Sequence, residues 1–234
     1  MRLLITGTSG FIGGYLANYF LSKKWDVWGL SRHENAKIQH QRFHWIKSDL
    51  AKNIPALPEI DYCILCAALS PAPGLKINDY IRNNIQATQH SLEALQTQLS
   101  CQRLFYLSGV SVYGQVKETL VDEETPSIDP DNYGMSKLLS ERLLMDQFIL
   151  PVTVLRLPGV LGPGSQTPWV VKQIRKAFEN ELIQAYNPEA FFNNAVWVED
   201  IAKFIETLLN NEDLPSKNLF LLAAKELMSI REII

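Results

Sequence analysis

Three glycines near the N-terminus have a spacing that suits phosphate binding. Gly7, Gly10 and Gly13 follow the apolar run Leu3–Ile5 and lead into a helical apolar pattern that begins at Phe11. In a strand–turn–helix unit, the first glycine permits the tight turn, the second lets a pyrophosphate approach, and the third lets the helix pack on the strand. The helix N-terminus adds free N–H groups. The stretch predicts a dinucleotide site; the alternative is a glycine-rich turn that binds nothing.

The end of the second predicted strand bears on which dinucleotide is bound. Residues Trp25–Leu30 read as a strand, and Ser31 and Arg32 follow it. An NAD-binding unit usually carries an acidic residue here, which bonds the ribose 2′-hydroxyl. A guanidinium instead binds a 2′-phosphate bidentately, and a serine hydroxyl adds a donor. The pair favours NADP(H) over NAD(H), unless Arg32 is a solvated loop residue and the selectivity is weak.

These residues need a scaffold of alternating strands and helices. Strands are predicted at 3–5, 25–30, 43–47, 60–66, 103–108 and 152–157, with long helices at 78–99 and 131–149. The pattern indicates an α/β fold, a doubly wound parallel sheet of the Rossmann type, with a ligand at the carboxyl ends of the strands. Tyr133 and Lys137 share one face of the second long helix.

The pattern changes after the sixth strand. A helix is predicted at 170–180, a short strand at 182–186, a helix at 201–209, a strand at 219–222 and a helix beginning at 229. We therefore expect a dinucleotide-binding domain at 1–160. Residues 161–234 would form a C-terminal substrate lobe that is interleaved with the core. This lobe would be small, incomplete or disordered.

Composition excludes several classes of protein. The net charge of −3 argues against a nucleic-acid or anionic-membrane surface, and 47% hydrophobic with 20% charged residues is ordinary for a globular protein. No apolar run approaches a membrane span and no leader precedes the first strand, so we expect a cytoplasmic protein. Cys63 and Cys66 lie in a predicted strand, which favours two core cysteines over a redox pair. The histidines show no ligand spacing, and no metal site is predicted.

Taken in order, these segments resemble the extended short-chain dehydrogenase/reductase superfamily, in its NAD(P)-dependent epimerase/dehydratase branch. The resemblance covers nearly the whole chain. A lone Tyr-x-x-x-Lys is a weak motif, but the set in this order is strong. The matching segments are Thr6–Gly13, Asp49–Leu50, Cys66–Ala68, Asn84, Leu107–Gly114, Tyr133–Lys137, Arg156–Gly164 and Val198–Ile201.

The resemblance implies roles for individual positions. Tyr133 would be the general acid/base at the carbon that exchanges hydride with nicotinamide C4, and Lys137 would favour its phenolate and bond the nicotinamide ribose. Asp49 would bond the adenine amino group, with Leu50 beside the ring. The residues expected to contact the dinucleotide are Gly7, Thr8, Ser9, Gly10, Phe11, Ile12, Gly13, Ser31, Arg32, Asp49, Leu50, Ala67, Ala68, Asn84, Tyr133, Lys137 and Leu157.

Two departures from the family pattern concern catalysis. The family usually has a serine or threonine where this chain has Gly109, and its hydroxyl bonds the substrate oxygen. Loss of one such donor costs roughly 10²–10³ in rate. Ser108, Ser111 or a water would have to substitute, or the protein is slow or inactive. Family dehydratases carry an Asp-Glu pair where Val110 and Ser111 stand here, which argues against a dehydratase.

Two functions remain after this reading. The first is an NADP(H)-dependent reductase or epimerase acting on a nucleoside diphosphate sugar, with Ser31 and Arg32 favouring a reductase. A homodimer through the helices at 78–99 and 131–149 is common in the family, although these faces could instead only cover the sheet. The second is a dinucleotide-binding regulator or scaffold without turnover. Gly109 favours the second function, whereas the retained Tyr133 argues against it.

Overall fold

The apolar runs of the chain form one parallel sheet with its strands in a doubly wound order. The computed structural model describes residues 1–98, 100–147 and 150–234. The strand order is β10-β6-β5-β4-β1-β2-β3, and every neighbouring pair is parallel. This confirms the predicted fold class. The strands are β1 (Arg2–Thr6), β2 (Asp26–Ser31), β3 (Phe43–Lys47), β4 (Tyr62–Leu65), β5 (Arg103–Gly109), β6 (Val152–Leu157) and β10 (Lys217–Leu221).

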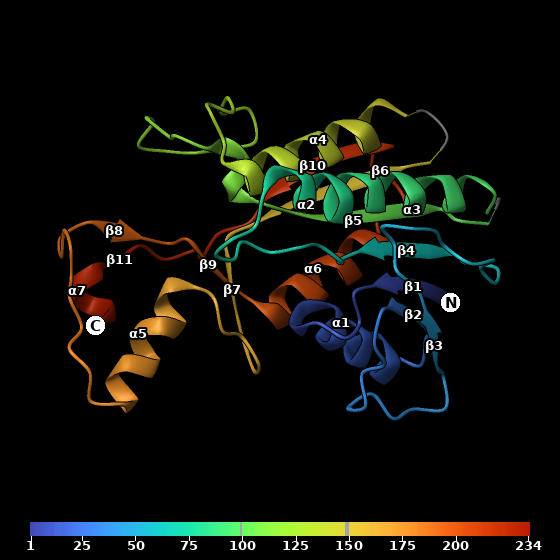
Figure 1. The fold of residues 1–234 in the computed structure, drawn as a ribbon, viewed down its shortest axis with the longest axis horizontal. Coiled ribbons are helices and arrows are strands. Elements are labelled where there is room, and N and C mark those ends of the chain that lie inside the picture. Colours follow the sequence, from blue (N-terminus) through green and yellow to red (C-terminus); the bar gives the residue numbers. More distant parts are fainter. Residues whose placement is uncertain (99, 148–149) are drawn as a thin grey trace.

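Helices cover both faces of the sheet (Figure 1). α1 (Phe11–Ser22) and α6 (Val198–Leu209) lie on one face, and α3 (Ala87–Gln96) and α4 (Asn132–Asp146) lie on the other. Alternate residues of a strand point to opposite faces, so β1 contributes to both cores. Leu3 and Ile5 pack with α1 and α6, whereas Leu4 packs with the α3 and α4 side. Among the described residues, no helix is both long and apolar enough to cross a bilayer.

The long helix predicted at 78–99 is built in three parts. α2 (Ile77–Tyr80) continues into a π-helical segment (Ile81–Gln86) and then into α3. A π-helical segment widens the helix locally and is frequent at functional sites. Leu99 lies outside the described residues, as do Phe148 and Ile149 at the end of the helix predicted at 131–149.

The C-terminal part both extends the sheet and forms a separate lobe. Residues 198–221 supply α6 and β10, so they pack with the sheet layers although they follow residue 160. The lobe lies to the left in Figure 1. Its elements are β7 (Gly159–Leu161), α5 (Trp169–Phe178), β8 (Phe191–Phe192), β9 (Ala195–Trp197), β11 (Met228–Ser229) and α7 (Ile230–Ile233), with β7 paired to β9 and β8 to β11.

The strand predicted at 182–186 was wrong. Residues 181–185 have no regular structure, and Leu182 and Tyr186 are exposed. An apolar run becomes a strand only where another strand offers backbone hydrogen bonds. In this lobe the pairing with β11 goes to Phe191–Phe192 instead.

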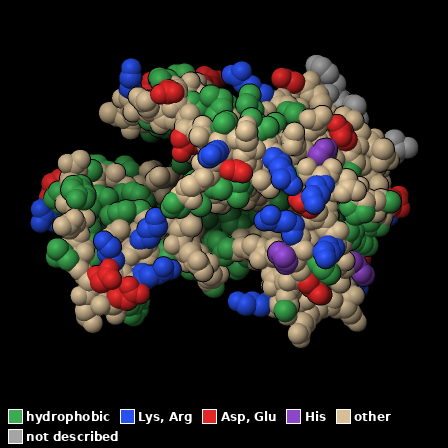
Figure 2. All heavy atoms as spheres, in the orientation of Figure 1, with side chains coloured by type: hydrophobic (Ala, Val, Ile, Leu, Met, Phe, Trp, Pro, Cys, Tyr) green, Lys and Arg blue, Asp and Glu red, His purple; other side chains and the backbone are tan. Residues whose placement is uncertain are grey.

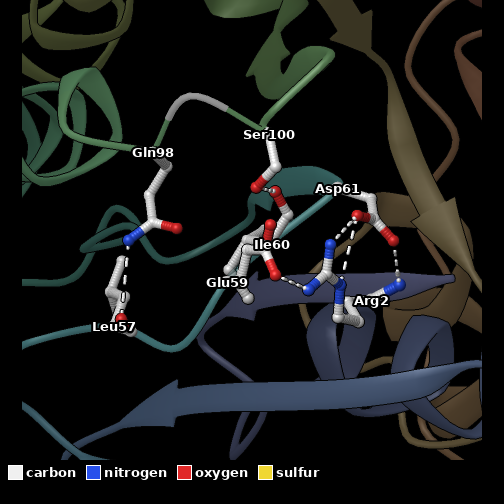
Figure 3. Close-up of polar contacts among 7 residues, drawn as sticks. All are labelled: Arg2, Leu57, Glu59, Ile60, Asp61, Gln98 and Ser100. Atoms are coloured by element: carbon white, nitrogen blue, oxygen red, sulfur yellow. Dashed lines mark hydrogen bonds and ion pairs between the residues drawn. The ribbon is translucent and has the colours of Figure 1, made fainter.

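Polar contacts at the start of β1 and β4 hold these two strands in register (Figure 3). The Arg2 backbone N–H donates to Asp61 Oδ2 at 2.8 Å, and its guanidinium donates to Asp61 Oδ1 and also pairs with Glu59. Nearby, the Ser100 hydroxyl donates to the carbonyl of Ile60 at 2.9 Å. Because β1 and β4 are parallel neighbours, the same register brings their carboxyl ends together, where the glycine turn begins.

Candidate active site

The glycine turn between β1 and α1 is shaped to leave backbone open to a ligand. Gly7 has φ +75°, and a Cβ there would lie 2.9 Å from Ala67 Cα. A Cβ on Gly13 would lie 2.4 Å from the carbonyl oxygen of Gly7. The turn itself therefore requires both glycines. A Cβ on Gly10 would meet only the Gly7 oxygen, at 3.3 Å. The space in front of Gly10 therefore fits the pyrophosphate of a dinucleotide.

A large cavity opens at the carboxyl ends of the strands, where β1 and β4 mark the reversal of strand order. Its volume is about 920 Å³, at the upper end of the range usual for ligand-binding pockets. Figure 2 shows the hollow near the centre of this face. The predicted site residues that line it are Gly7, Ser9, Gly10, Phe11, Ile12, Gly13, Ser31, Arg32, Asp49, Leu50, Ala67, Ala68, Ser108, Ser111, Tyr133, Lys137 and Leu157.

Thr8 and Asn84 are the predicted site residues that do not line this cavity. Thr8 is fully buried beneath the turn, and its carbonyl accepts a hydrogen bond from the Asn35 amide at 2.9 Å. Its hydroxyl lies 3.5 Å from that of Ser31. Thr8 thus ties the glycine turn to the loop after β2.

Thr6 joins the two strand ends on either side of the site. Its Oγ1 accepts hydrogen bonds from the backbone N–H groups of Cys66 and Ala67, both at 3.0 Å. Thr6→Val keeps the shape but leaves two donors unpaired, at about 1–3 kcal/mol each. We expect a loss of about 2–6 kcal/mol in the free energy of unfolding, measured by urea titration. Thr6→Ser keeps the acceptor and serves as the control; equal losses in both variants would contradict this account.

The loop after β2 leaves a free cation but not a free hydroxyl. Ser31 Oγ donates to the carbonyl of His33 at 2.7 Å and accepts from Trp45 Nε1 at 3.1 Å. The Ser31 hydroxyl is therefore already bonded within the protein. Arg32 is exposed at the cavity, and within the described ranges its side chain has no ion pair or hydrogen bond. Arg32 is the group here that remains available to a ligand.

The residues after β3 form another part of the cavity wall. Asp49 and Leu50 are half-buried in its wall. Asp49 Oδ1 accepts from the backbone N–H of Ala51 at 3.3 Å, and the Leu50 carbonyl lies 2.8 Å from His90 Nδ1. These contacts fix the loop, and the second carboxylate oxygen of Asp49 lies 4.0 Å from Lys52 Nζ.

Tyr133 and Lys137 project from the first turns of α4. Asp131 is the N-cap of this helix, and its carboxylate accepts from the Gly134 N–H at 2.7 Å. Lys137 is 2% exposed; its Nζ donates to the Leu107 carbonyl at 2.6 Å and lies 4.1 Å from the centre of the Tyr106 ring. Burial raises the pKa of Tyr133 and the Lys137 charge opposes this shift, whereas burial lowers the pKa of Lys137. The two side chains thus lie in one cavity, with Lys137 almost fully buried.

Asn84 braces the helix that carries this pair. Its Nδ2 donates to Ser136 Oγ at 2.8 Å, and Ser136 Oγ donates to the Tyr133 carbonyl at 2.7 Å. Asn84 Oδ1 also accepts from the backbone N–H of Leu69 at 2.7 Å. The neighbouring Asn83 lines the cavity instead. Asn84, which the sequence predicts as a dinucleotide contact, is therefore buried in the helix packing and does not line the cavity.

Cys66 packs against the core and also reaches the cavity wall. Cys63 is fully buried in β4, but the strand ends at Leu65, and Cys66 is half-buried in the cavity wall. Burial raises the pKa of the Cys66 thiol to about 12, which keeps it neutral. Within the described ranges, no three His, Cys, Asp or Glu residues are grouped as metal ligands.

Two loops also form cavity walls. Ser70 and Pro71 follow β4, and residues 164–168 precede α5. Lys172, in the first turn of α5, lines the cavity as well, whereas Arg175 does not. The Pro- and Gly-rich composition marked these segments as loops, but composition carries no information on what a loop faces.

Comparison with known proteins decides the family. The model of the NAD dependent epimerase/dehydratase family matches residues 3–223, nearly the whole chain. The chain belongs to this family. The motifs of the sequence predicted the epimerase/dehydratase branch of the extended short-chain dehydrogenase/reductase superfamily, and the family match confirms this prediction.

Individual family members differ in activity. An uncharacterized UDP-glucose epimerase of Bacillus subtilis is 27% identical, over 92% of this chain and 74% of that protein. A trifunctional UDP-glucose dehydratase, epimerase and reductase of Arabidopsis thaliana is 25% identical, over 91% of this chain and 35% of its own length. UDP-glucuronic acid 4-epimerase from Bacillus cereus, solved in complex with NAD, superposes with a TM-score of 0.85 at 25% identity, covering 99% of this chain and 80% of that one.

Proposed function

We propose that this protein is an NAD(P)-dependent oxidoreductase of the sugar-nucleotide epimerase or reductase type. It would move hydride between nicotinamide C4 and a hydroxyl or keto carbon of a nucleoside diphosphate sugar. The observation that carries the proposal is the placement of Tyr133 and buried Lys137 in the same cavity as the open glycine turn. The relatives named above act on UDP-sugars, which supports this substrate class.

The chain's own part in the reaction is proton transfer and orientation. The dinucleotide supplies or accepts the hydride. In the reductive direction, the Tyr133 phenol gives its proton to the keto oxygen. Lys137, fixed by its bond to the Leu107 carbonyl, stabilises the phenolate that remains. The brace from Asn84 through Ser136 holds the Tyr133 backbone in place.

The proposal includes a preference for NADP(H), a reductase rather than an epimerase, and no dehydratase activity. The preference is supported by the free guanidinium of Arg32 at the cavity edge. The lack of dehydratase activity is supported by Val110 and Ser111, which stand where family dehydratases carry two acidic residues. A homodimer belongs to the proposal as well, since Ile81, Met135 and Leu139 are exposed on the helices concerned.

Arg32→Ala tests the cofactor preference. A charge-assisted hydrogen bond contributes about 1.5–3 kcal/mol, so affinity for NADPH should fall roughly 10–150-fold. Affinity for NADH should change less than about threefold, because NADH carries no 2′-phosphate for Arg32 to bind. Fluorescence titration of both dinucleotides measures this. Lys37→Ala removes an exposed cation from the same loop outside the cavity lining, and it should leave both affinities unchanged. Equal loss of NADPH and NADH with Arg32→Ala would refute the preference.

The activity itself is tested on the purified protein. Any dinucleotide that copurifies is identified first, and UDP-4-keto sugars are then offered with NADPH while absorbance of the reduced nicotinamide is followed. Consumption of NADPH supports a reductase. Tightly retained NAD with interconversion of UDP-sugars supports an epimerase and rejects the NADP(H) preference. If the protein binds neither dinucleotide, the proposed enzymatic function is rejected.

A dinucleotide-binding regulator is the second candidate, and Gly109 is the observation that favours it. The position where the family bonds the substrate oxygen carries no hydroxyl. This candidate predicts dinucleotide binding without turnover on any sugar nucleotide. The same assay therefore separates the two functions.

A further inference from the structure

Gly109 is a glycine that the backbone does not need. Its φ of −151° and ψ of 155° are extended, a conformation that any residue adopts. A Cβ built there would meet no atom closer than 3.5 Å, which is ordinary van der Waals contact. Gly134 differs, because a Cβ on it would lie 2.2 Å from the Ser111 carbonyl oxygen. The missing side chain at residue 109 thus leaves a space in the cavity wall that the fold could have filled.

That space is bordered by oxygen atoms. The nearest atoms to a Cβ at residue 109 would be Ser111 Oγ at 3.5 Å, the Leu157 carbonyl oxygen at 3.7 Å and the Tyr133 hydroxyl at 3.9 Å. The Ser111 Oγ is buried, and in the described part of the chain it has no hydrogen-bond partner. A buried polar atom without a partner costs about 1–3 kcal/mol, so a ligand oxygen that enters the space would relieve this cost.

The fold holds Ser111 beside Tyr133. Ser111 lies in the 3₁₀ turn Val110–Tyr113 that follows β5, and the first turn of α4 packs on its backbone at Gly134. No hydrogen bond restrains the Ser111 hydroxyl within the described ranges, so rotation about its Cα–Cβ bond breaks no bond of this kind. The Ser108 hydroxyl is also unpartnered, but it precedes Gly109 on β5 and points to the opposite side of the strand. Ser111 is therefore the better placed of the two.

We propose that Ser111 is a catalytic residue whose hydroxyl donates a hydrogen bond to the oxygen of the reacting carbon, in the space that Gly109 leaves open beside Tyr133. This inference rests on the proposed function. In the reductive direction the carbonyl carbon would take a hydride from C4 of a bound reduced nicotinamide, and the carbonyl oxygen would take the Tyr133 proton. A C–H and an O–H bond would form while the C=O π bond, the nicotinamide C4–H bond and the Tyr133 O–H bond break. Ser111 keeps its proton throughout and stabilises the charge that develops on the oxygen.

Three variants test this assignment, each assayed as full chain with NADPH and a UDP-4-keto sugar. Ser111→Ala should lower kcat roughly 10²–10³-fold with NADPH affinity unchanged. Gly109→Ala combined with Ser111→Ala should fold normally, because a Cβ at residue 109 would meet no atom closer than 3.5 Å, and it should recover none of the lost kcat, since it adds no hydroxyl. The double variant Gly109→Ser with Ser111→Ala returns a hydroxyl to the same space, and should recover at least roughly tenfold of the lost kcat.

The outcomes separate this inference from the function on which it rests. Ser22→Ala, on the exposed part of α1, is the control serine. If the wild type turns over but Ser111→Ala keeps most of its kcat, or the double variant recovers nothing, the assignment to Ser111 is overturned while the enzyme stands. If the wild type transfers no hydride to any keto-sugar nucleotide, the proposed function fails and this inference fails with it.

Discussion

Replacing Tyr133 with phenylalanine is expected to lower kcat roughly 10²–10⁴-fold while leaving dinucleotide affinity nearly unchanged. The variant loses only the hydroxyl oxygen and keeps the ring, which packs edge-on against Tyr80 with the centroids 6.2 Å apart. Lys137 also keeps its bond to the Leu107 carbonyl. Hydride transfer then lacks its proton donor, although the cavity is intact. The measurement pairs steady-state kinetics with dinucleotide titration.

Lys137→Met gives a different result that checks the same pair. Burial raises the pKa of Tyr133, and the Lys137 charge lowers it. Removal of that charge therefore raises the pKa further. In the oxidative direction the phenolate is the base, so activity is present above this pKa and lost below it. The pH–rate profile should move to higher pH in Lys137→Met. A Tyr133→Phe enzyme that keeps more than about a tenth of kcat would contradict the role of Tyr133.

Replacing Glu141 with alanine is expected to destabilise the fold by about 3–5 kcal/mol. Glu141 on α4 and Arg156 on β6 form an ion pair with Nη2 and Oε2 2.8 Å apart, and the residues are 3% and 6% exposed. The guanidinium also lies 4.8 Å from the Tyr113 ring. Without the carboxylate, a buried cation is left without its partner. For a chain of this size the melting temperature should fall by roughly 10 °C, measured by calorimetry.

The double variant Glu141→Leu with Arg156→Met is the matched comparison. It removes both charges and fills similar volume, so it should be clearly more stable than Glu141→Ala. The remaining loss would report the other contacts of Arg156, such as its bond to the Glu123 carbonyl at 3.3 Å. If the double variant is as unstable as the single one, the buried charge is not the cause. Since α4 carries Tyr133, a fall in kcat should accompany the instability of the single variant.

Local spacing in the sequence was sufficient to predict the fold and the two ends of the site. The glycines of residues 7–13 specify a turn by their lack of side chains, and the contacts of Gly7 and Gly13 bear this out. Tyr133 and Lys137 share a helix face because they are four residues apart, and both line the cavity. Such features depend on residues only a few positions apart in the sequence. Over this short range, periodicity indicates which residues share a face of a helix or strand.

Tertiary packing decided the rest, because it depends on segments far apart in the chain. Whether Asn83 or Asn84 faces the cavity follows from the π-helical segment packed against α4. The Ser31 hydroxyl is bonded to Trp45 of the neighbouring strand, which no local pattern predicts. Because Gly134 has no side chain, α4 packs directly against the backbone of Ser111, and this places the Ser111 hydroxyl near Tyr133. Sequence alone thus predicted which residues lie at the cavity, and packing determined which of their polar atoms have no hydrogen-bond partner in the described part of the chain.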